Sequence, residues 1–301
     1  MAWVKVRLAT PAPAVGGIEA LLETLGAVAV SLEDAGDQPL LEPAPGDAPL
    51  WQDVVVSGLF PAEPDPRPRL EAAAAAWQEA SGHALPEPRF EPLADADWTA
   101  AWRRYARPLS FPGRLHLVPV DEHGAGVGEA PAEDGGARVR LAPGLAFGTG
   151  AHPTTRLCLA RLAAEPPAGC AVLDFGCGSG VLALAALVLG ARTVLAVDHD
   201  PQARAATREN AVLNGRAPGI SVRDALPADA RCGLLLANVL ARPLVELAPR
   251  LRAAVVPGGR AVLSGILPAQ AAAVEAAWPD FVFARHEEAG WLCLDGRRGG
   301  P

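Results

Sequence analysis

The sequence predicts two domains: a small α+β domain with a ferredoxin-like order over residues 1–93, and a doubly wound α/β domain over residues 109–301. In the first segment, strand and helix patterns follow one another as β-α-β-β-α-β, the order of a split βαβ unit. From Ala171 onward, near-continuous apolar strands alternate with helices, which is the pattern of a parallel sheet covered on both faces. Of the 301 residues, 50% are apolar and 20% are charged, so the chain can form two ordered domains.

Local periodicity and the positions of glycine and proline define the elements of the first domain. They are, in order, a strand over 3–8, a helix over 18–25, strands over 27–32 and 54–60, a helix over 70–80 and a strand over 89–93. No cluster of His, Cys or paired carboxylates occurs in this segment, so we expect a recognition module. Residues 94–108, which start with possible N-caps and end at Pro108, predict a helix that links the domains.

The second domain shows a regular strand–helix alternation. The expected strands cover 171–175, 192–198, 220–223, 232–237 and 260–264; the expected helices cover 181–189, 201–214, 242–255 and 268–278; a hairpin built from 281–283 and 290–294 closes the chain. The acidic, glycine-rich segment 121–136 has no periodicity and predicts a solvated loop. A doubly wound sheet binds its ligands at the carboxyl ends of the strands, so we expect the functional residues there.

Composition excludes several classes of function. The 26 basic and 34 acidic residues give a net charge of −8, which disfavours a nucleic-acid grip through phosphates and suits a small-molecule site or a basic protein partner. The longest apolar run, 181–191, is too short for a membrane-spanning helix, and no export signal is visible. The five cysteines form no CxxC pair and no Cys/His ligand spacing, so we expect reduced thiols, no metal site and a cytoplasmic location. We also expect a monomer.

A glycine-rich turn is expected at the end of the first strand of the second domain. The run Asp-Phe-Gly-Cys-Gly-Ser-Gly over 174–180 follows that strand and opens a helix, which lets the backbone approach a ligand closely. Its spacing differs from the G-x-G-x-x-G of dinucleotide sites, because Val181 stands at the last glycine position. Asp198 ends the next strand, where a carboxylate can accept hydrogen bonds from a ribose diol. We therefore expect a ribose-containing cofactor near Gly176, Gly178 and Asp198; the alternative is a purely structural turn.

These motifs resemble the cofactor site of class I methyltransferases, which use S-adenosylmethionine and have a Rossmann-like sheet. The resemblance implies that Gly176 and Gly178 lie against the methionine part and that Asp198 holds the ribose hydroxyls. It leaves Asp224 open as either an adenine contact or an ordinary loop acid. Three further segments are similar to the ribosomal protein L11 methyltransferase (PrmA) family: 143–159, with Phe-Gly-Thr-Gly-Ala-His-Pro-Thr-Thr over 147–155, then 236–241 and 263–267. The small first domain also resembles the substrate-recognition domain of that family.

Three side chains outside the glycine turn are candidates for the reaction. Asn238 follows an apolar strand, so its carbonyl oxygen could accept hydrogen bonds from an amine or contact the cofactor; the alternative is a simple strand-end turn. By resemblance, Thr155 touches the cofactor; the alternative is an N-cap for the following helix. Phe147, with glycines on either side, could form a lid over the reacting amine. His152, before a proline, fits a turn-stabilising role better than that of a base.

The resemblance implies a methyltransferase that modifies lysine side chains and the N-terminal amine of ribosomal protein L11. An alternative acceptor is a lysine of another protein, such as electron-transfer flavoprotein. A nucleic-acid base methyltransferase is disfavoured by the net charge and by the lack of a basic patch interleaved with aromatic residues. A scaffold without activity is disfavoured because Gly176, Gly178, Asp198 and Asn238 are all present. We expect no direct nucleic-acid specificity and no membrane association.

Overall fold

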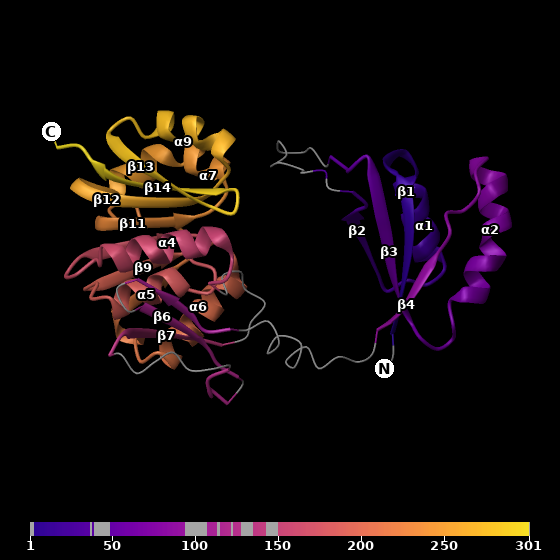
Figure 1. Cartoon of the computed structure of the whole chain (residues 1–301), viewed down its shortest axis with the longest axis horizontal. Helices are drawn as coiled ribbons and strands as arrows, with labels where there is room; N and C mark the ends of the chain where they lie inside the picture. Colours follow the sequence, from indigo (N-terminus) through magenta and orange to yellow (C-terminus); the bar gives the residue numbers. More distant parts are fainter. Residues whose placement is uncertain are drawn as a thin grey trace. The chain divides into compact units, whose positions relative to one another are not determined.

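The computed structural model describes residues 3–36, 38, 49–93, 107–112, 115–121, 123–127, 135–142 and 150–300. The chain divides into two compact units, Met1–Trp98 and Thr99–Pro301 (Figure 1). Most of the expected linker helix, namely 94–106, lies outside the described residues, as does the segment 143–149 with the expected lid residue Phe147.

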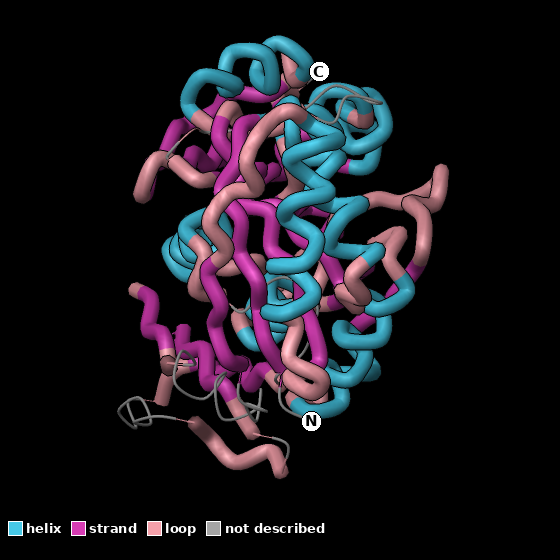
Figure 2. The backbone as a smooth tube through the Cα atoms, turned by 90° about the vertical axis from the view of Figure 1, so that its right-hand side faces the viewer, coloured by secondary structure: helices cyan, strands magenta, loops and turns pink. Residues whose placement is uncertain are grey.

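The first unit has the predicted β-α-β-β-α-β order. Its elements are β1 (Trp3–Pro11), a short 3-10 turn η1 (Ala12–Ala14), α1 (Val15–Thr24), β2 (Ala29–Asp34), β3 (Asp53–Pro61), α2 (Arg67–Ser81) and β4 (Arg89–Leu93). The sheet order is β2-β3-β1-β4, and the paired strands are antiparallel. Side chains of both helices join one apolar core with those of the sheet. The ribbon shows the two helices on the same face of this sheet (Figure 1), and Figure 2 shows the backbone from the side. The predicted ferredoxin-like fold is confirmed.

The second unit is built around a large sheet. Its strands are β8 (Ala171–Phe175), β9 (Thr193–Val197), β10 (Ile220–Arg223), β11 (Cys232–Asn238), β12 (Val255–Ile266), β13 (Phe281–Glu288) and β14 (Trp291–Arg298). Their order across the sheet is β10-β9-β8-β11-β12-β14-β13. β8 to β12 pair in parallel, whereas β14 runs antiparallel to both β12 and β13. The predicted parallel sheet with a closing hairpin is therefore confirmed.

Helices cover both faces of this sheet (Figure 1). They are α4 (Pro153–Ala164), α5 (Val181–Val188), α6 (Pro201–Leu213), α7 (Ala241–Glu246), α8 (Ala248–Ala254) and α9 (Ala271–Ala277), with the 3-10 turns η2 (Ala217–Gly219) and η3 (Pro268–Gln270). Successive strand residues enter different cores: Val172 joins the core under α4 and α5, and Leu173 joins the core under α7, α8 and α9. This alternation makes the sheet doubly wound.

Three local features differ from the expectation. The single helix expected over 242–255 is two helices, α7 and α8, because Pro249 has no N–H group with which to continue the hydrogen-bond ladder. β12 begins at Val255, so the expected turn 257–259 lies inside a strand with a register shift. A small sheet of β5 (Leu109–Phe111), β6 (Leu115–Pro119) and β7 (Ala137–Leu141) was not expected at all.

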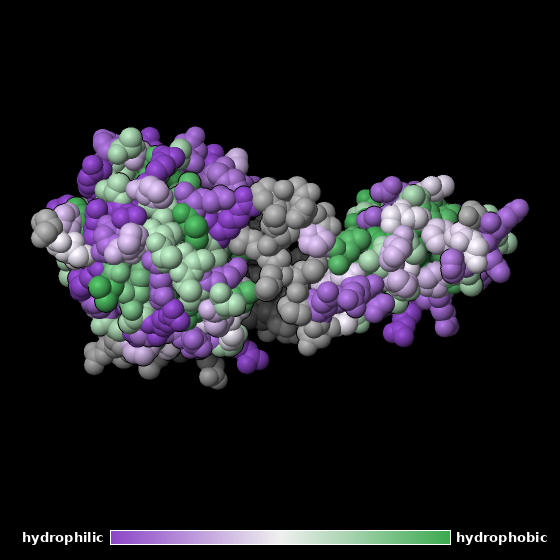
Figure 3. Space-filling model, turned by 90° about the horizontal axis from the view of Figure 1, so that it is seen from above, coloured by the Kyte–Doolittle hydropathy of each residue, from purple (hydrophilic) through white to green (hydrophobic). Residues whose placement is uncertain are grey.

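The surface of the second unit carries hydrophobic residues in small groups between hydrophilic ones on the face seen in Figure 3. Among the described residues, the most exposed large apolar side chains are Val282 and Val212, 82% and 70% accessible. Isolated exposed residues of this kind are normal on protein surfaces. No helix in the described part of the chain has the length and apolar character needed to cross a bilayer.

Candidate active site

The carboxyl ends of β8, β9, β10 and β11 lie side by side at one edge of the large sheet. The strand order reverses at β8: the chain proceeds from β8 to β9 and β10 on one side, and then returns to β11 on the other. In open α/β sheets the crevice at such a reversal point is the usual ligand site. The residues that follow these strand ends therefore form the candidate active site.

The glycine-rich turn after β8 needs its glycines. Gly176, Gly178 and Gly180 have φ angles of 76°, 52° and 79°, which side chains disfavour. A Cβ at Gly176 would also collide with the side chain of Val239. The amide of Gly176 donates to the carbonyl of Val197 over 2.8 Å, so the turn is bonded to the end of β9.

Two polar residues of α6 hold the carbonyl groups of this turn. The hydroxyl of Thr207 donates to the carbonyl of Gly178 over 2.9 Å, and the amide of Asn210 donates to that of Ser179, also over 2.9 Å. Both side chains are buried. Sequence reasoning missed them; the available signal is that they share the buried face of α6 with Ala203 and Ala211.

The carboxylate of Asp198, directly after β9, binds the same turn. Its Oδ2 accepts from the amide of Gly178 over 2.9 Å, and its Oδ1 accepts from the amide of Asp200 over 3.0 Å. An ionised carboxylate offers about four acceptor positions, so roughly two remain available. Asp198 therefore positions the turn and can still accept hydrogen bonds from a ligand.

Asp174, in β8, is the buried acid beneath the turn. Its Oδ2 accepts from the amide of Ala183 in the first turn of α5 over 3.0 Å, whereas its Oδ1, also buried, has no hydrogen-bond partner among the described residues. Burial raises the pKa of Asp174 to about 7, opposed by the Ala183 amide and assisted by the nearby charge of Asp198. This carboxyl group is thus divided between its neutral and charged forms near neutral pH.

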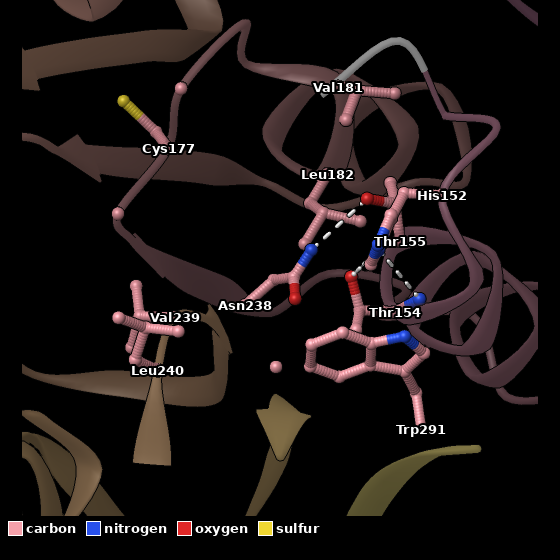
Figure 4. Close-up of a pocket in the computed structure, with 13 residues that line it drawn as sticks. His152, Thr154, Thr155, Cys177, Val181, Leu182, Asn238, Val239, Leu240 and Trp291 are labelled. Atoms are coloured by element: carbon pink, nitrogen blue, oxygen red, sulfur yellow. Dashed lines mark hydrogen bonds between the residues drawn. The ribbon is translucent and has the colours of Figure 1, made fainter. Parts of the chain in front are cut away.

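Asn238 and Thr155 meet across the site, although they are 83 residues apart in the chain. Asn238 is the last residue of β11, and its Nδ2 donates to the hydroxyl Oγ1 of the buried Thr155 over 3.1 Å. This bond turns the carbonyl oxygen of Asn238 away from Thr155, toward the side on which Trp291, Val239 and Leu240 lie (Figure 4).

The cap of α4 is His152, and the alternative reading of Thr155 as the N-cap is wrong. The Nδ1 of His152 lies 2.8 Å from the hydroxyl of Thr154 and accepts from the Thr154 amide over 3.4 Å. Because Nδ1 accepts a hydrogen bond, the proton of the neutral imidazole lies on Nε2. The basic nitrogen of this tautomer, Nδ1, is therefore already used within the cap. His152 therefore has the turn-stabilising role expected from the sequence.

Two neighbouring cavities occupy this edge of the sheet. The smaller, of about 320 Å³, is lined by His152, Thr154, Thr155, Gly176, Cys177, Gly178, Val181, Leu182, Asn238, Val239, Leu240, Gly265 and Trp291 (Figure 4). The larger, of about 670 Å³, is lined by Phe175, Gly176, Gly178, Val197, Asp198, His199, Asp224, Ala225, Leu226, Val239, Leu240, Pro243, Leu247, Arg250 and Leu251. Four lining residues are common to both cavities, so one elongated ligand can extend from one into the other.

Comparison with known proteins identifies the family. A family model described as ribosomal protein L11 methyltransferase (PrmA) matches residues 2–299. The chain belongs to this family. A ribosomal protein L11 methyltransferase of Azotobacter vinelandii is 45% identical over 303 residues, which cover 99% of this chain and 100% of the relative. That of Marinobacter nauticus is 44% identical over 308 residues, 99% of each chain. A solved ribosomal protein L11 methylase from Lactobacillus delbrueckii subsp. bulgaricus is 33% identical with a TM-score of 0.54, covering 62% of this chain and 95% of that chain.

Membership of the L11 methyltransferase family confirms the predicted resemblance, the Rossmann-like class I methyltransferase sheet and the enzyme class, a methyltransferase that uses S-adenosylmethionine. The residues present fit this cofactor. Each cavity lies within the ~300–1,000 Å³ typical of small-molecule pockets. The larger one combines the partly free carboxylate of Asp198 with apolar side chains such as Leu226 and Leu240, which suit a ribose and a purine ring.

All five predicted site residues border these cavities. Thr155, Gly176, Gly178 and Asn238 line the smaller cavity, and Asp198 lines the larger one. Asp224, which the sequence left open, lines the larger cavity too. Within the described residues, no group of three or more His, Cys, Asp or Glu side chains is arranged to hold a metal ion.

Proposed function

We propose that this chain transfers methyl groups from S-adenosylmethionine to amino groups of ribosomal protein L11, on lysine side chains and on the N-terminal amine. The observation that carries this proposal is the length of the similarity to the A. vinelandii L11 methyltransferase, 99% of this chain and 100% of the relative. That match includes the small first unit as well as the methyltransferase unit. We further propose that the chain acts as a monomer in the cytoplasm, where ribosomal proteins are modified.

The cofactor roles follow from the donor and acceptor groups of the site. Asp198 has acceptor positions left for the ribose hydroxyls after it binds Gly178 and Asp200. Gly176 and Gly178 have no side chains, so the backbone at these two positions admits the methionine part closely. The hydroxyl of Thr155, held by Asn238, supports a contact with the methionine carboxylate or amino group.

The reaction needs a neutral amine, a fixed geometry and little water. When bound, S-adenosylmethionine supplies a methyl group on a positively charged sulfur. Deprotonating a lysine of pKa ~10.4 at pH 7 costs about 4–5 kcal/mol, at 1.36 kcal/mol per unit. The described residues around the smaller cavity include no carboxylate, so the protein offers no counter-ion to an ammonium that loses its water there. The loss of water lowers the pKa of the amine. The side-chain carbonyl of Asn238 then accepts a hydrogen bond from an N–H of the neutral amine and so orients the lone pair of the amine nitrogen.

The first unit supplies the surface for protein recognition in this proposal. A core of helices and strands fills one side of its sheet, and no group of potential metal ligands occurs among its described residues. The net charge of −8 on the whole chain suits a basic acceptor protein such as a ribosomal protein.

The direct test is to incubate the chain with methyl-labelled S-adenosylmethionine and isolated ribosomal proteins or whole ribosomes, and then to locate the label. We expect label on amino groups of L11, and a loss of at least tenfold for Asn238→Ala. Gln202→Ala, which removes an exposed amide on α6, is the matched control and should label L11 as the unchanged chain does. Label on RNA, or on no ribosomal protein, would remove the proposal.

A further inference from the structure

An aromatic side chain forms the wall of the smaller cavity next to Asn238. Trp291, the first residue of β14, lines this cavity together with Asn238 and Leu240. Figure 4 shows the six-membered ring of the indole on the side of Asn238 and the ring nitrogen on the opposite side. The aromatic hydrocarbon ring of Trp291 and the side chain of Asn238 therefore border the same part of the cavity.

Two contacts hold Trp291 in place. Its ring packs edge-on against the His152 ring, with the ring centroids 5.2 Å apart and the planes at 67°. Trp291 also pairs with Glu288 across a two-residue turn, Ala289 and Gly290, whose φ angles are both positive, as in a type I′ hairpin. Glu288 forms a 2.6 Å ion pair with Arg156 of α4, which fixes the hairpin to the helix that His152 caps.

In the proposed reaction, the amine nitrogen that enters this cavity changes its hydrogen-bonding capacity with each methyl group. The amine lone pair forms the new nitrogen–carbon bond, the carbon–sulfur pair stays on sulfur, and the positive charge passes from sulfur to nitrogen. A neutral primary amine has two N–H groups for Asn238; one methyl leaves one, and two methyls leave none. A twice-methylated nitrogen thus loses the Asn238 contact, whereas its growing charge is still attracted by a π system.

We propose that Trp291 is the residue that lets this pocket accept amines that are already methylated, by stabilising the charge that develops on an alkylated nitrogen. The inference rests on the proposed amine methyltransferase function. Around this cavity, the described titratable side chains are His152 and Cys177, and neither supplies a negative charge at neutral pH; burial raises the pKa of Cys177 to about 12. The π face and the carbonyl of Asn238 are therefore the groups suited to a cationic nitrogen.

The test compares two acceptors: unmodified L11, and L11 whose amines have been dimethylated with formaldehyde and borohydride. We expect Trp291→Leu to lower kcat/KM about tenfold on dimethylated L11, within the range of cation–π contacts, and no more than about threefold on unmodified L11. Trp291→Phe, which keeps a π face, should recover most of the loss. Asn238→Ala should show the reverse preference, with its larger loss on unmodified L11.

Calorimetric titration with S-adenosylhomocysteine separates this role from damage to the cofactor site. We expect Trp291→Leu and Trp291→Phe to bind this compound with the affinity of the unchanged chain. If Trp291→Leu lost the same factor in kcat/KM on the two acceptors, or if the unchanged chain did not methylate dimethylated L11, the inference about Trp291 would be overturned. The proposed function would still stand. Failure of the unchanged chain to methylate unmodified L11 would overturn the proposed function and the inference with it.

Discussion

The carboxylate of Asp198 combines two tasks at the scale of one residue. It accepts backbone amides of Gly178 and Asp200, which fixes the glycine turn, and it keeps acceptor positions toward the larger cavity. Asp198→Ala should weaken binding of S-adenosylhomocysteine by about 1–3 kcal/mol through the loss of charge-assisted hydrogen bonds. Calorimetric titration measures this, with the exposed Glu209→Ala on α6 as control. Unchanged affinity in Asp198→Ala would contradict the ribose assignment.

Asp174 makes the stability of the second unit depend on pH. Its folded pKa is raised by burial from 3.8 to about 7, so the folded state binds the proton more tightly than the unfolded state. Stability from this group is present below pH ~4 and is lost as the pH rises through ~7, by up to roughly 4 kcal/mol. Asp174→Asn removes this titration.

Relative to the unchanged chain, Asp174→Asn should therefore gain stability between pH 5 and pH 8, and its own free energy of unfolding should vary less with pH. Urea unfolding at the two pH values gives both free energies. A constant difference between the two proteins across this range would show that Asp174 does not titrate there.

At the scale of elements, α6 acts as the support of the glycine turn. Thr207→Val keeps the shape of the side chain but removes the hydroxyl that donates to Gly178. We expect a loss of about 1 kcal/mol in stability and a several-fold weaker affinity for S-adenosylhomocysteine, because the turn is no longer held. Thr193→Val, an exposed threonine in β9, is the matched control. If both variants bind equally well, the support is not needed.

Local sequence predicted some elements closely, strands and helices alike, and missed others. The bounds of β8, β10 and β4 agree with the expectation, because short apolar or alternating runs there end at glycine, proline or charged residues. The helix break at Pro249 was missed, since the apolar pattern continues through it. The small sheet was missed because β5 is only three residues long and β6 pairs in parallel with a strand some twenty residues further on.

At the scale of the whole molecule, the periodicity and the strand-end acids predicted the sheet and the position of Asp198 and Asn238 at its edge. The contact between Asn238 and Thr155 could not be predicted from spacing, because only the fold brings together residues 83 positions apart. The same holds for Trp291, which reaches the pocket through the closing hairpin. Thus residues at strand ends can be predicted from the local pattern, whereas the side chains that the fold places beside them cannot.

The absence of a carboxylate among the described residues of the smaller cavity predicts how methylation depends on pH. Because the acceptor must be neutral, kcat/KM for a lysine of pKa ~10.4 should rise about tenfold per unit between pH 7 and 9. Initial rates with L11 at saturating cofactor measure this slope, and Asp174→Asn should retain it. A flat profile would mean that a base in the protein already removes the proton below pH 7.

The central claim is that S-adenosylmethionine binds where β8, β9 and β11 end, across both cavities. A crystal structure of the chain with S-adenosylhomocysteine tests it most directly. We predict the ribose hydroxyls within hydrogen-bond distance of the Asp198 carboxylate, and the thioether sulfur between the turn at Gly176 and the side chain of Asn238. Density for the ligand outside these two cavities, or with its ribose away from Asp198, would contradict the account.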